Sequence, residues 1–153
     1  MKFGSSPLKD LLRAHQSGGV LLLSEMIVGV GIVAAMKRQE IIDYCLTLPA
    51  AYEDYPFDSV ADPGAWTVMR HKTNRKSFAL IYERQGRLRV NVKCDPFEAD
   101  FMRQAYKDVT PGWHMNKAHW NTITVGGDVP DDDVKQMIER SYYLIKPKVR
   151  KRT

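Results

Sequence analysis

Apolar residues recur with helical spacing in three stretches of the chain. In the first stretch, which follows Met36, the apolar positions are Ile41, Ile42, Cys45, Leu46 and Leu48, and Pro49 ends the pattern. Intervals of three and four residues place such side chains on one side of a helix. The sequence therefore predicts a first helix between Met36 and Pro49.

The other two helical stretches begin and end at recognisable signals. Asp95-Pro96 combines a favoured N-cap residue with a proline at the first turn, and the apolar stripe that follows is Phe97, Phe101, Met102 and Tyr106. The last helix is predicted to begin at Asp128 or Pro130, with Asp131 to Asp133 at the positive end of its dipole, and to stop at Pro147. Its inner face is expected to contain Val134, Met137, Ile138, Tyr142 and Ile145.

Apolar and polar residues alternate in four further stretches, which predicts strands. These are residues 66–70, 78–82, 87–93 and 120–125, with Gln85-Gly86 as the turn between the second and the third. Residues 51–64 are predicted to be irregular, with Tyr52, Tyr55 and Phe57 covering one end of the core, and Thr110-Pro111-Gly112 is predicted to break the chain. The predicted fold class is α+β, an antiparallel sheet with helices packed on one face.

Residues 1–35 differ from the rest of the chain in having few charges and a glycine-rich apolar stretch. We interpret them as an N-terminal extension that is non-native or poorly ordered, or alternatively as a segment that docks on the domain, and we leave them out of the site. The domain is predicted to span residues 36–146, and residues 147–153 form a basic tail. The apolar run before Met36 is interrupted by Ser24 and Glu25 and is too short for a spanning helix, so we expect no membrane association.

The composition of the chain predicts a cellular compartment and a class of partner. The 153 residues carry a net charge of +5, which favours acidic partners. Two cysteines, Cys45 and Cys94, are too few for the disulfide framework of a secreted protein, so a reducing cytoplasm is expected. The length suits one domain, and we expect a monomer.

Basic residues gather where two hairpin tips are predicted, and these tips are expected to be neighbours. Between residues 70 and 89 seven basic side chains face one acid, Glu83. Such tips can contact phosphates as wings, which makes nucleic acid the predicted partner; the alternative is that the charges keep loops and sheet edges solvated. The predicted contacts are Arg70, Lys72, Arg75, Lys76, Arg84, Arg87 and Arg89.

The run from Thr110 to Thr122 is the most unusual in composition, with two Trp, two His, two Asn and one Lys. Aromatic rings beside amides and cations can stack on and hydrogen-bond to a ligand. Lys117 and His119 could also line a nucleic-acid surface. In the alternative interpretation the tryptophans fill the core, which the alternating pattern favours for Trp120. The possible ligand pocket consists of Trp113, His114, Asn116, Trp120 and Asn121.

No set of residues predicts catalysis, a metal site or a cofactor. His114 and His119 are five residues apart, a spacing that does not place both on one helical face, and no acid lies between them. Cys94 could act as a nucleophile only beside a base and in a setting that favours the thiolate. We therefore expect a binding protein, not an enzyme; the alternative is a small-ligand or protein-interaction module without enzymatic activity.

Several segments together resemble the MmcQ/YjbR family, in an order and spacing that cover the chain from Met36 to Ile145. They are Leu48-Pro49, Tyr52 to Phe57 (YEDYPF), Lys76 to Leu80 (KSFAL), Asn91 to Pro96 (NVKCDP), Pro111 to Thr122 (PGWHMNKAHWNT) and Ser141-Tyr142. The resemblance implies a frataxin-like (CyaY-like) α+β fold and DNA binding by a double-wing sheet. It also implies roles for Lys93 and for the run from His114 to Asn121. Two features depart from the family pattern: Asp58 replaces a frequent glycine, and the polar loop from His71 to Arg75 is longer.

Overall fold

The structure is a computed structural model that describes residues 35–57 and 65–150. The predicted N-terminal extension, apart from Ala35, and the last three residues of the predicted tail lie outside the described residues. The helices are α3 (Arg38–Leu46), α4 (Pro96–Ala105) and α5 (Asp131–Ile145). The strands are β1 (Ala51–Asp54), β2 (Thr67–His71), β3 (Ser77–Arg84), β4 (Arg87–Lys93), β5 (Val109–Pro111) and β6 (Trp120–Thr124).

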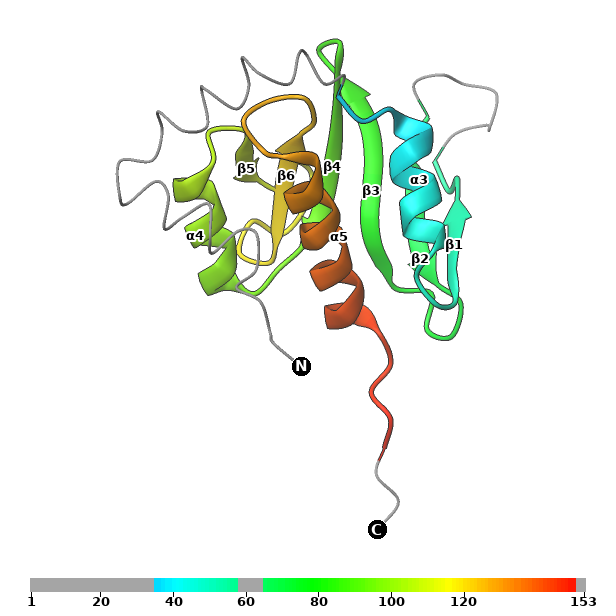
Figure 1. Ribbon diagram of the computed structural model, residues 1–153. Helices are drawn as coiled ribbons and strands as arrows, with labels where there is room; N and C mark the ends of the chain where they lie inside the picture. Colours follow the sequence, from blue (N-terminus) through cyan, green and yellow to red (C-terminus); the bar gives the residue numbers. More distant parts are fainter. Residues whose placement is uncertain (1–34, 58–64, 151–153) are drawn as a thin grey trace. The chain divides into compact units, whose positions relative to one another are not determined.

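The six strands form one antiparallel sheet in the order β1-β2-β3-β4-β6-β5. The helices cover one face of this sheet (Figure 1). Helix α5 packs against the central strands β3 and β4, α3 against β1, and α4 against β5 and β6. This arrangement confirms the predicted α+β class with helices on one face of an antiparallel sheet.

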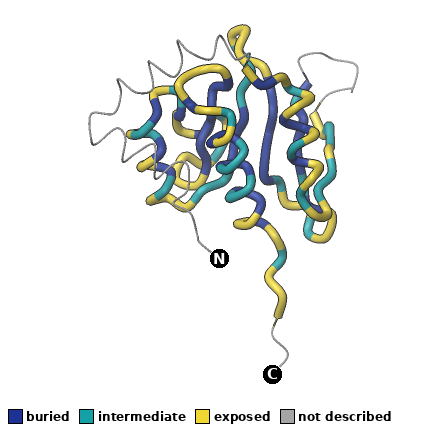
Figure 2. Tube along the Cα trace, viewed as in Figure 1, coloured by how far each residue is buried: buried dark blue, intermediate teal, exposed yellow. Residues whose placement is uncertain are grey.

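The core lies between the helices and the central strands. Ile81, Val90, Ile123 and Ile138 are fully buried there, and Figure 2 shows β3 buried along most of its length while the turns are exposed. Ser141 of α5 also anchors the helix to the sheet, because its hydroxyl donates to a carbonyl of β3 and accepts from a backbone N–H of β4. Burial of apolar area is the main stabilising contribution here.

The opposite face of the sheet carries none of the described helices, and we call it the open face. Asn121 donates to a carbonyl of α4, so its neighbours in β6 point to the open face because side chains alternate along a strand. On that face Trp120 packs with Val68 and Leu80 in a buried cluster, covered by the half-buried Trp66 and Met115. Both faces of the sheet therefore contain buried apolar side chains.

Two strands were not predicted. Residues 51–54 were expected to be irregular, but they pair with β2 as an edge strand, since tertiary pairing outweighs the local signals of the nearby prolines and acids. Residues 109–111, expected in part as a break, form the other edge strand. An edge position tolerates Pro111, because proline lacks the N–H that an inner strand must donate.

The predicted apolar stripe of the second helix was partly wrong. Phe97 and Phe101 are 83% and 43% exposed, while Ala99 and Met102 are buried. The helix begins as predicted, with Asp95 accepting a hydrogen bond from the Phe97 N–H at 3.0 Å. Ala99 is therefore buried in place of the two phenylalanines, while Met102 and Tyr106 of the predicted stripe are buried as expected.

Candidate functional site

Aromatic side chains from three separate segments stack on the open face. The rings of Trp66 and Tyr82 are nearly parallel, with centroids 4.1 Å apart and 5° between their planes. Trp113 stacks beside both, at centroid distances of 5.7 Å from Trp66 and 5.4 Å from Tyr82. His114 lies 4.0 Å from Trp113 in a tilted arrangement. We call these four residues the aromatic stack.

Buried polar side chains hold the backbone of Trp113 in place. Asn91 donates to the Trp113 carbonyl at 3.0 Å, and the Trp113 N–H donates to the Thr122 hydroxyl at 2.9 Å. The amide oxygen of Asn91 also accepts from the hydroxyls of Tyr82 and Thr122, at 2.9 and 2.6 Å. Breaking such a bond leaves a buried polar group without a partner, which is costly. The loop is therefore rigid where it joins the aromatic stack.

His114, the next residue, adopts a left-handed backbone conformation with a φ of +60°. This conformation costs free energy for a residue that has a Cβ atom, and it persists only where the surrounding structure enforces it. Gly112, on the other side of Trp113, lies so close to Trp120 that an added Cβ would come within 2.7 Å of the Trp120 Cβ. The loop is thus pressed tightly onto the sheet.

Three arginines of the β3–β4 hairpin adjoin the aromatic stack. The guanidinium carbon of Arg84 lies 4.5 Å from the centre of the Trp113 ring, which is a cation–π contact. Arg87 is opposite Arg84 in the strand register, and Arg89 is opposite Tyr82. Burial raises the pKa of the Tyr82 hydroxyl, and the charges of Arg89 and Arg84 oppose this rise. We call Arg84, Arg87 and Arg89 the hairpin cluster.

The two basic turns do not form the pair of neighbouring tips that the sequence predicted. They lie at opposite ends of β3 (Figure 1), because successive turns of an antiparallel meander alternate between the two ends of the sheet. Strand β3 has eight residues. At about 3.3 Å per residue, the two turns are therefore roughly 25 Å apart.

The β2–β3 turn lies beside the end of α5. Asn74 in this turn donates to the carbonyl of Ile145 at 2.7 Å. The turn is tight despite its polar sequence, since the Arg75 N–H donates to the His71 carbonyl and Arg75 has a φ of +59°. The exposed lysines and arginine of this turn form one basic region with two exposed lysines that follow α5. We call this region the turn cluster, and its members are Lys72, Arg75, Lys76, Lys146 and Lys148.

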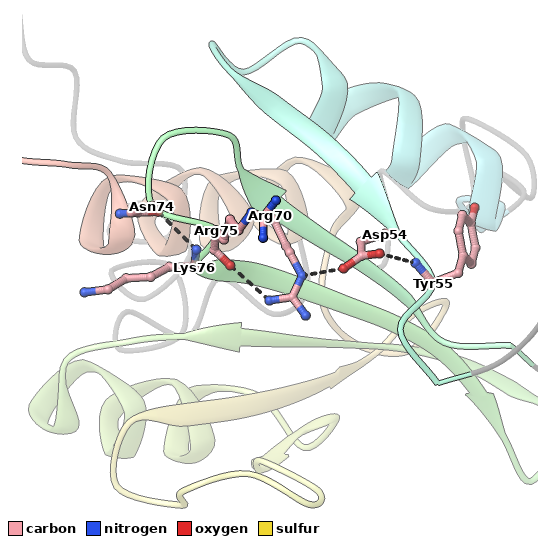
Figure 3. A network of polar contacts seen from close by, with 6 residues as sticks. All are labelled: Asp54, Tyr55, Arg70, Asn74, Arg75 and Lys76. Atoms are coloured by element: carbon pink, nitrogen blue, oxygen red, sulfur yellow. Dashed lines mark hydrogen bonds and ion pairs between the residues drawn. The ribbon is translucent and has the colours of Figure 1, made fainter.

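Arg70 is engaged within the protein. Its Nε donates to Asp54 at 2.8 Å and its Nη1 to the Arg75 carbonyl at 3.0 Å, as Figure 3 shows together with the hydrogen bond from the Lys76 N–H to Asn74. The Lys76 side chain extends away from this network (Figure 3). Arg70 therefore supports the shape of the turn and is less available to a phosphate than the exposed lysines.

The remaining predicted site residues are dispersed. Lys117 and His119 are exposed, and Lys117 donates to the Gly112 carbonyl at 3.2 Å. Lys93 is half-buried and lies opposite Trp120 in register, at the end of β4 far from the hairpin. These residues are near the end of the sheet that carries the turn cluster and not near the hairpin cluster.

Of the predicted ligand pocket, the structure keeps Trp113, His114 and Trp120 on the open face, with Trp120 beneath Trp66 and Met115, and separates Asn116 and Asn121 from them. Asn116 closes a turn by accepting from the Ala118 N–H at 3.0 Å. Trp120 is buried in the core, as its alternating pattern predicted. Asn121 lies on the helix-covered face, where it contacts α4.

Sequence reasoning missed Trp66, Tyr82, Asn91 and Thr122 as parts of the site. They come from β3, β4, β6 and the residue before β2, and only the pairing of these strands brings them together. The one available signal was polar: Asn91 and Thr122 are uncharged hydrogen-bonding residues within predicted strands, and a buried polar residue requires a partner.

The thiols and the described carboxylates are the other groups that could react or bind a metal ion. Burial raises the pKa of Cys94 to about 11 and that of Cys45 to about 12. Within residues 35–57 and 65–150, no three His, Cys, Asp or Glu side chains are placed to bind a metal ion. In the same part of the chain no helix is both long and apolar enough to cross a membrane.

Comparison with solved structures finds the same fold in proteins from two bacteria. A crystal structure from Pseudomonas syringae has a TM-score of 0.63 and 26% identity, and the match covers 72% of this chain and all of the other. A crystal structure of the Deinococcus radiodurans protein DR2400, of the DUF419 domain family, has a TM-score of 0.62 and 31% identity over 72% of this chain and 78% of the other.

Sequence comparison finds relatives over the same region. The chain is 32% identical to the Escherichia coli K12 protein named "Uncharacterized protein YjbR" over 107 residues, 70% of this chain and 85% of that protein. It is 26% identical to the Bacillus subtilis "Uncharacterized protein YyaQ", over 72% of this chain and 99% of that protein. The YjbR family model matches residues 46–144, a span that holds every strand of the sheet and the aromatic stack, and the chain therefore belongs to the YjbR family.

Proposed function

We propose that the protein binds nucleic acid without catalysing a reaction, and that the open face beside the hairpin cluster is the main contact. The observation that carries the proposal is the Arg84 guanidinium resting on Trp113 of the aromatic stack. Arginines supply bidentate contacts to phosphates, and flat aromatic side chains supply stacking surfaces for bases. The two kinds of group meet on this part of the open face.

The charges of the hairpin cluster favour an anion. Arg84 and Arg87 face each other across the hairpin, and like charges in directly opposed positions repel. Arg89 beside them is half-buried, and its guanidinium donates to the Gln85 side chain at 3.1 Å. The nearby acid, Glu83, alternates with Arg84 along β3 and so points to the other face. A phosphate at this place would relieve the repulsion and accept hydrogen bonds.

The turn cluster is proposed as a second, separable contact. Its side chains are exposed, and Lys146 lies 5.6 Å from the centre of the Tyr143 ring. That ring is edge-on to Tyr142, so the described residues place no parallel stack here like that on the open face. The turn cluster resembles the solvated basic ends that many proteins carry, and such charges add affinity without selecting a ligand. We therefore assign it a smaller and less specific contribution.

The state of the thiols argues against a cysteine nucleophile. The thiolate is the nucleophilic form of cysteine, and the raised pKa values of Cys94 and Cys45 keep both groups protonated at neutral pH.

The test compares two double variants of the full chain that each remove two positive charges. Arg84→Gln with Arg87→Gln alters the hairpin cluster, and Lys72→Gln with Lys76→Gln alters the turn cluster. Binding of fluorescein-labelled oligonucleotides is measured by anisotropy at several salt concentrations. We expect the hairpin variant to lower the slope of log affinity against log salt by roughly 1.5, the value for two lost phosphate contacts. The turn variant should change the slope less.

Three results would contradict the proposal. The first is an absence of binding at low salt. The second is a hairpin variant with the affinity and slope of the unaltered protein. The third is loss of all binding when residues 147–153 are removed, which would assign the affinity to the basic tail alone.

A further inference from the structure

We infer that a pocket beside the aromatic stack receives an unpaired base, so that the protein prefers single-stranded over double-stranded nucleic acid. This inference rests on the proposed function. The pocket has a volume of about 300 Å³ and is lined by Phe57, Trp66, Leu80, His114 and Met115. That volume is at the lower end of the range for small-molecule sites, which suits one ring system better than an extended ligand.

The lining favours a flat, uncharged ring. Phe57 stands edge-on to Trp66, with centroids 6.3 Å apart and 85° between their planes, and His114 contributes the only titratable side chain of the lining. Phe57 is 66% exposed, so much of its ring is free to contact a ligand. A base that entered here would cover Phe57 and meet two aromatic walls and one imidazole.

The walls of the pocket are already ordered in the protein alone. The hydrogen bonds of Asn91 and Thr122 fix the backbone of Trp113, which stacks beside Trp66 of the pocket, and the next residue, His114, is held in a left-handed backbone conformation. Trp66 is held by its parallel contact with Tyr82. A site that is rigid before binding avoids the entropic cost of ordering it in the complex.

The position of the hairpin cluster selects a strand over a free base. The Trp113 ring stacks beside Trp66 of the pocket. The guanidinium carbon of Arg84 lies 4.5 Å from the centre of the same Trp113 ring. A nucleotide with its base in the pocket could therefore place its backbone on the arginines. In a duplex the base is paired and stacked, and removing it from the helix has a cost that a single strand does not meet.

The test uses the full chain and three labelled probes of about twelve nucleotides: a single strand, its duplex, and an abasic strand with the same number of phosphates. At equal salt we expect the intact strand to bind on the order of tenfold tighter than the abasic strand, the factor that one stacked base supplies. We also expect it to bind tighter than the duplex and to quench tryptophan fluorescence from the stack.

Phe57→Ala should remove most of the difference between the intact and abasic strands. Phe97→Ala, which truncates a phenylalanine of α4 that is even more exposed, should leave that difference unchanged. The comparison of the three probes on the unaltered protein does not depend on how well either variant folds.

The outcomes separate this inference from the proposed function. Equal affinity for all three probes, with binding still reduced by the hairpin variant, would overturn the pocket inference and leave nucleic-acid binding in place. No binding of any probe would overturn both. Fluorescence quenching by adenosine alone, without binding of any oligonucleotide, would overturn the inference and assign the pocket to a free aromatic molecule.

Discussion

At the scale of single residues, Thr122 links the sheet to the loop that carries the candidate site. Its hydroxyl accepts from the Trp113 N–H and donates to Asn91. Thr122→Val keeps the shape of the side chain but leaves both partners without this bond. We expect the free energy of unfolding to fall by about 1–3 kcal/mol, the usual cost of an unsatisfied buried polar group. Urea titration followed by tryptophan fluorescence measures this change.

Thr110→Val provides a matched control for this prediction. Thr110 is exposed and pairs directly with Thr122 across β5 and β6, so the same chemical change is made on the neighbouring strand. Its effect should stay within about 0.5 kcal/mol, as for most surface substitutions. Equal losses in the two variants would mean that the buried network does not hold the loop.

At the scale of elements, the β3–β4 hairpin depends on a turn with two left-handed residues. Gln85 has a φ of +54° and Gly86 of +70°, the pattern of a type I′ turn, in which Asn-Gly is preferred. Gly86→Ala should lower the free energy of unfolding by about 1 kcal/mol through backbone strain alone, because an added Cβ there meets no atom within 4 Å.

Gln85→Asn should act in the opposite direction at the adjacent position. Asparagine tolerates the left-handed conformation better than glutamine, so we expect a gain of a few tenths of a kcal/mol or slightly more. Both changes are measured by thermal and urea unfolding. A hairpin whose stability responds to neither substitution would be held by its packing and not by its turn.

The elements also show what the sequence could predict. Three helices and four strands were predicted near their observed places, because their periodicity and their signals, such as Asp95-Pro96 and Gln85-Gly86, are local. The edge strands β1 and β5 were missed because they are short and depend on a neighbour for pairing. The exposure of Phe97 has the same origin: the phase of a helix against a sheet is set by packing, not by the helix sequence.

The candidate site was less predictable than the fold. Trp113 and His114 were singled out by composition, and the arginines of the hairpin by charge. Their meeting with Trp66 and Tyr82 depends on strand register, which one sequence does not state. The two basic turns were predicted to form one surface because they follow each other closely along the chain. In an antiparallel meander, however, successive turns lie at opposite ends of the sheet.

At the scale of the whole molecule, the balance of charge and burial makes stability depend on pH. Asp133 and Tyr106 are both buried, and the Tyr106 hydroxyl donates to Asp133 at 2.7 Å. Burial raises the pKa of Asp133, although this hydrogen bond acts in the opposite direction. Burial and the adjacent carboxylate of Asp133 likewise raise the pKa of Tyr106.

The sign of the pH effect follows from these shifts. In the unfolded chain an aspartate has its ordinary pKa of about 3.9. The contribution of Asp133 to stability is therefore complete below that pH and is lost as the pH rises through its higher folded-state pKa. The contribution of Tyr106 has the same sign but is lost only above its unfolded pKa of about 10. Between weakly acidic and neutral pH the Asp133 contribution decreases.

Asp133→Asn should remove this decrease, because asparagine stays neutral and can still accept from the Tyr106 hydroxyl. We expect the free energy of unfolding of the variant, relative to the unaltered protein, to rise between about pH 4 and pH 7 by about 1.4 kcal/mol for each unit by which the pKa is raised. Urea titrations at a series of pH values measure the difference, and any constant offset between the two proteins cancels. Asp132→Asn removes an exposed acid from the same helical turn. Its effect measures the part of the pH dependence that is due to charge at the start of the helix. If the two variants had the same pH dependence, burial of Asp133 would not be the cause.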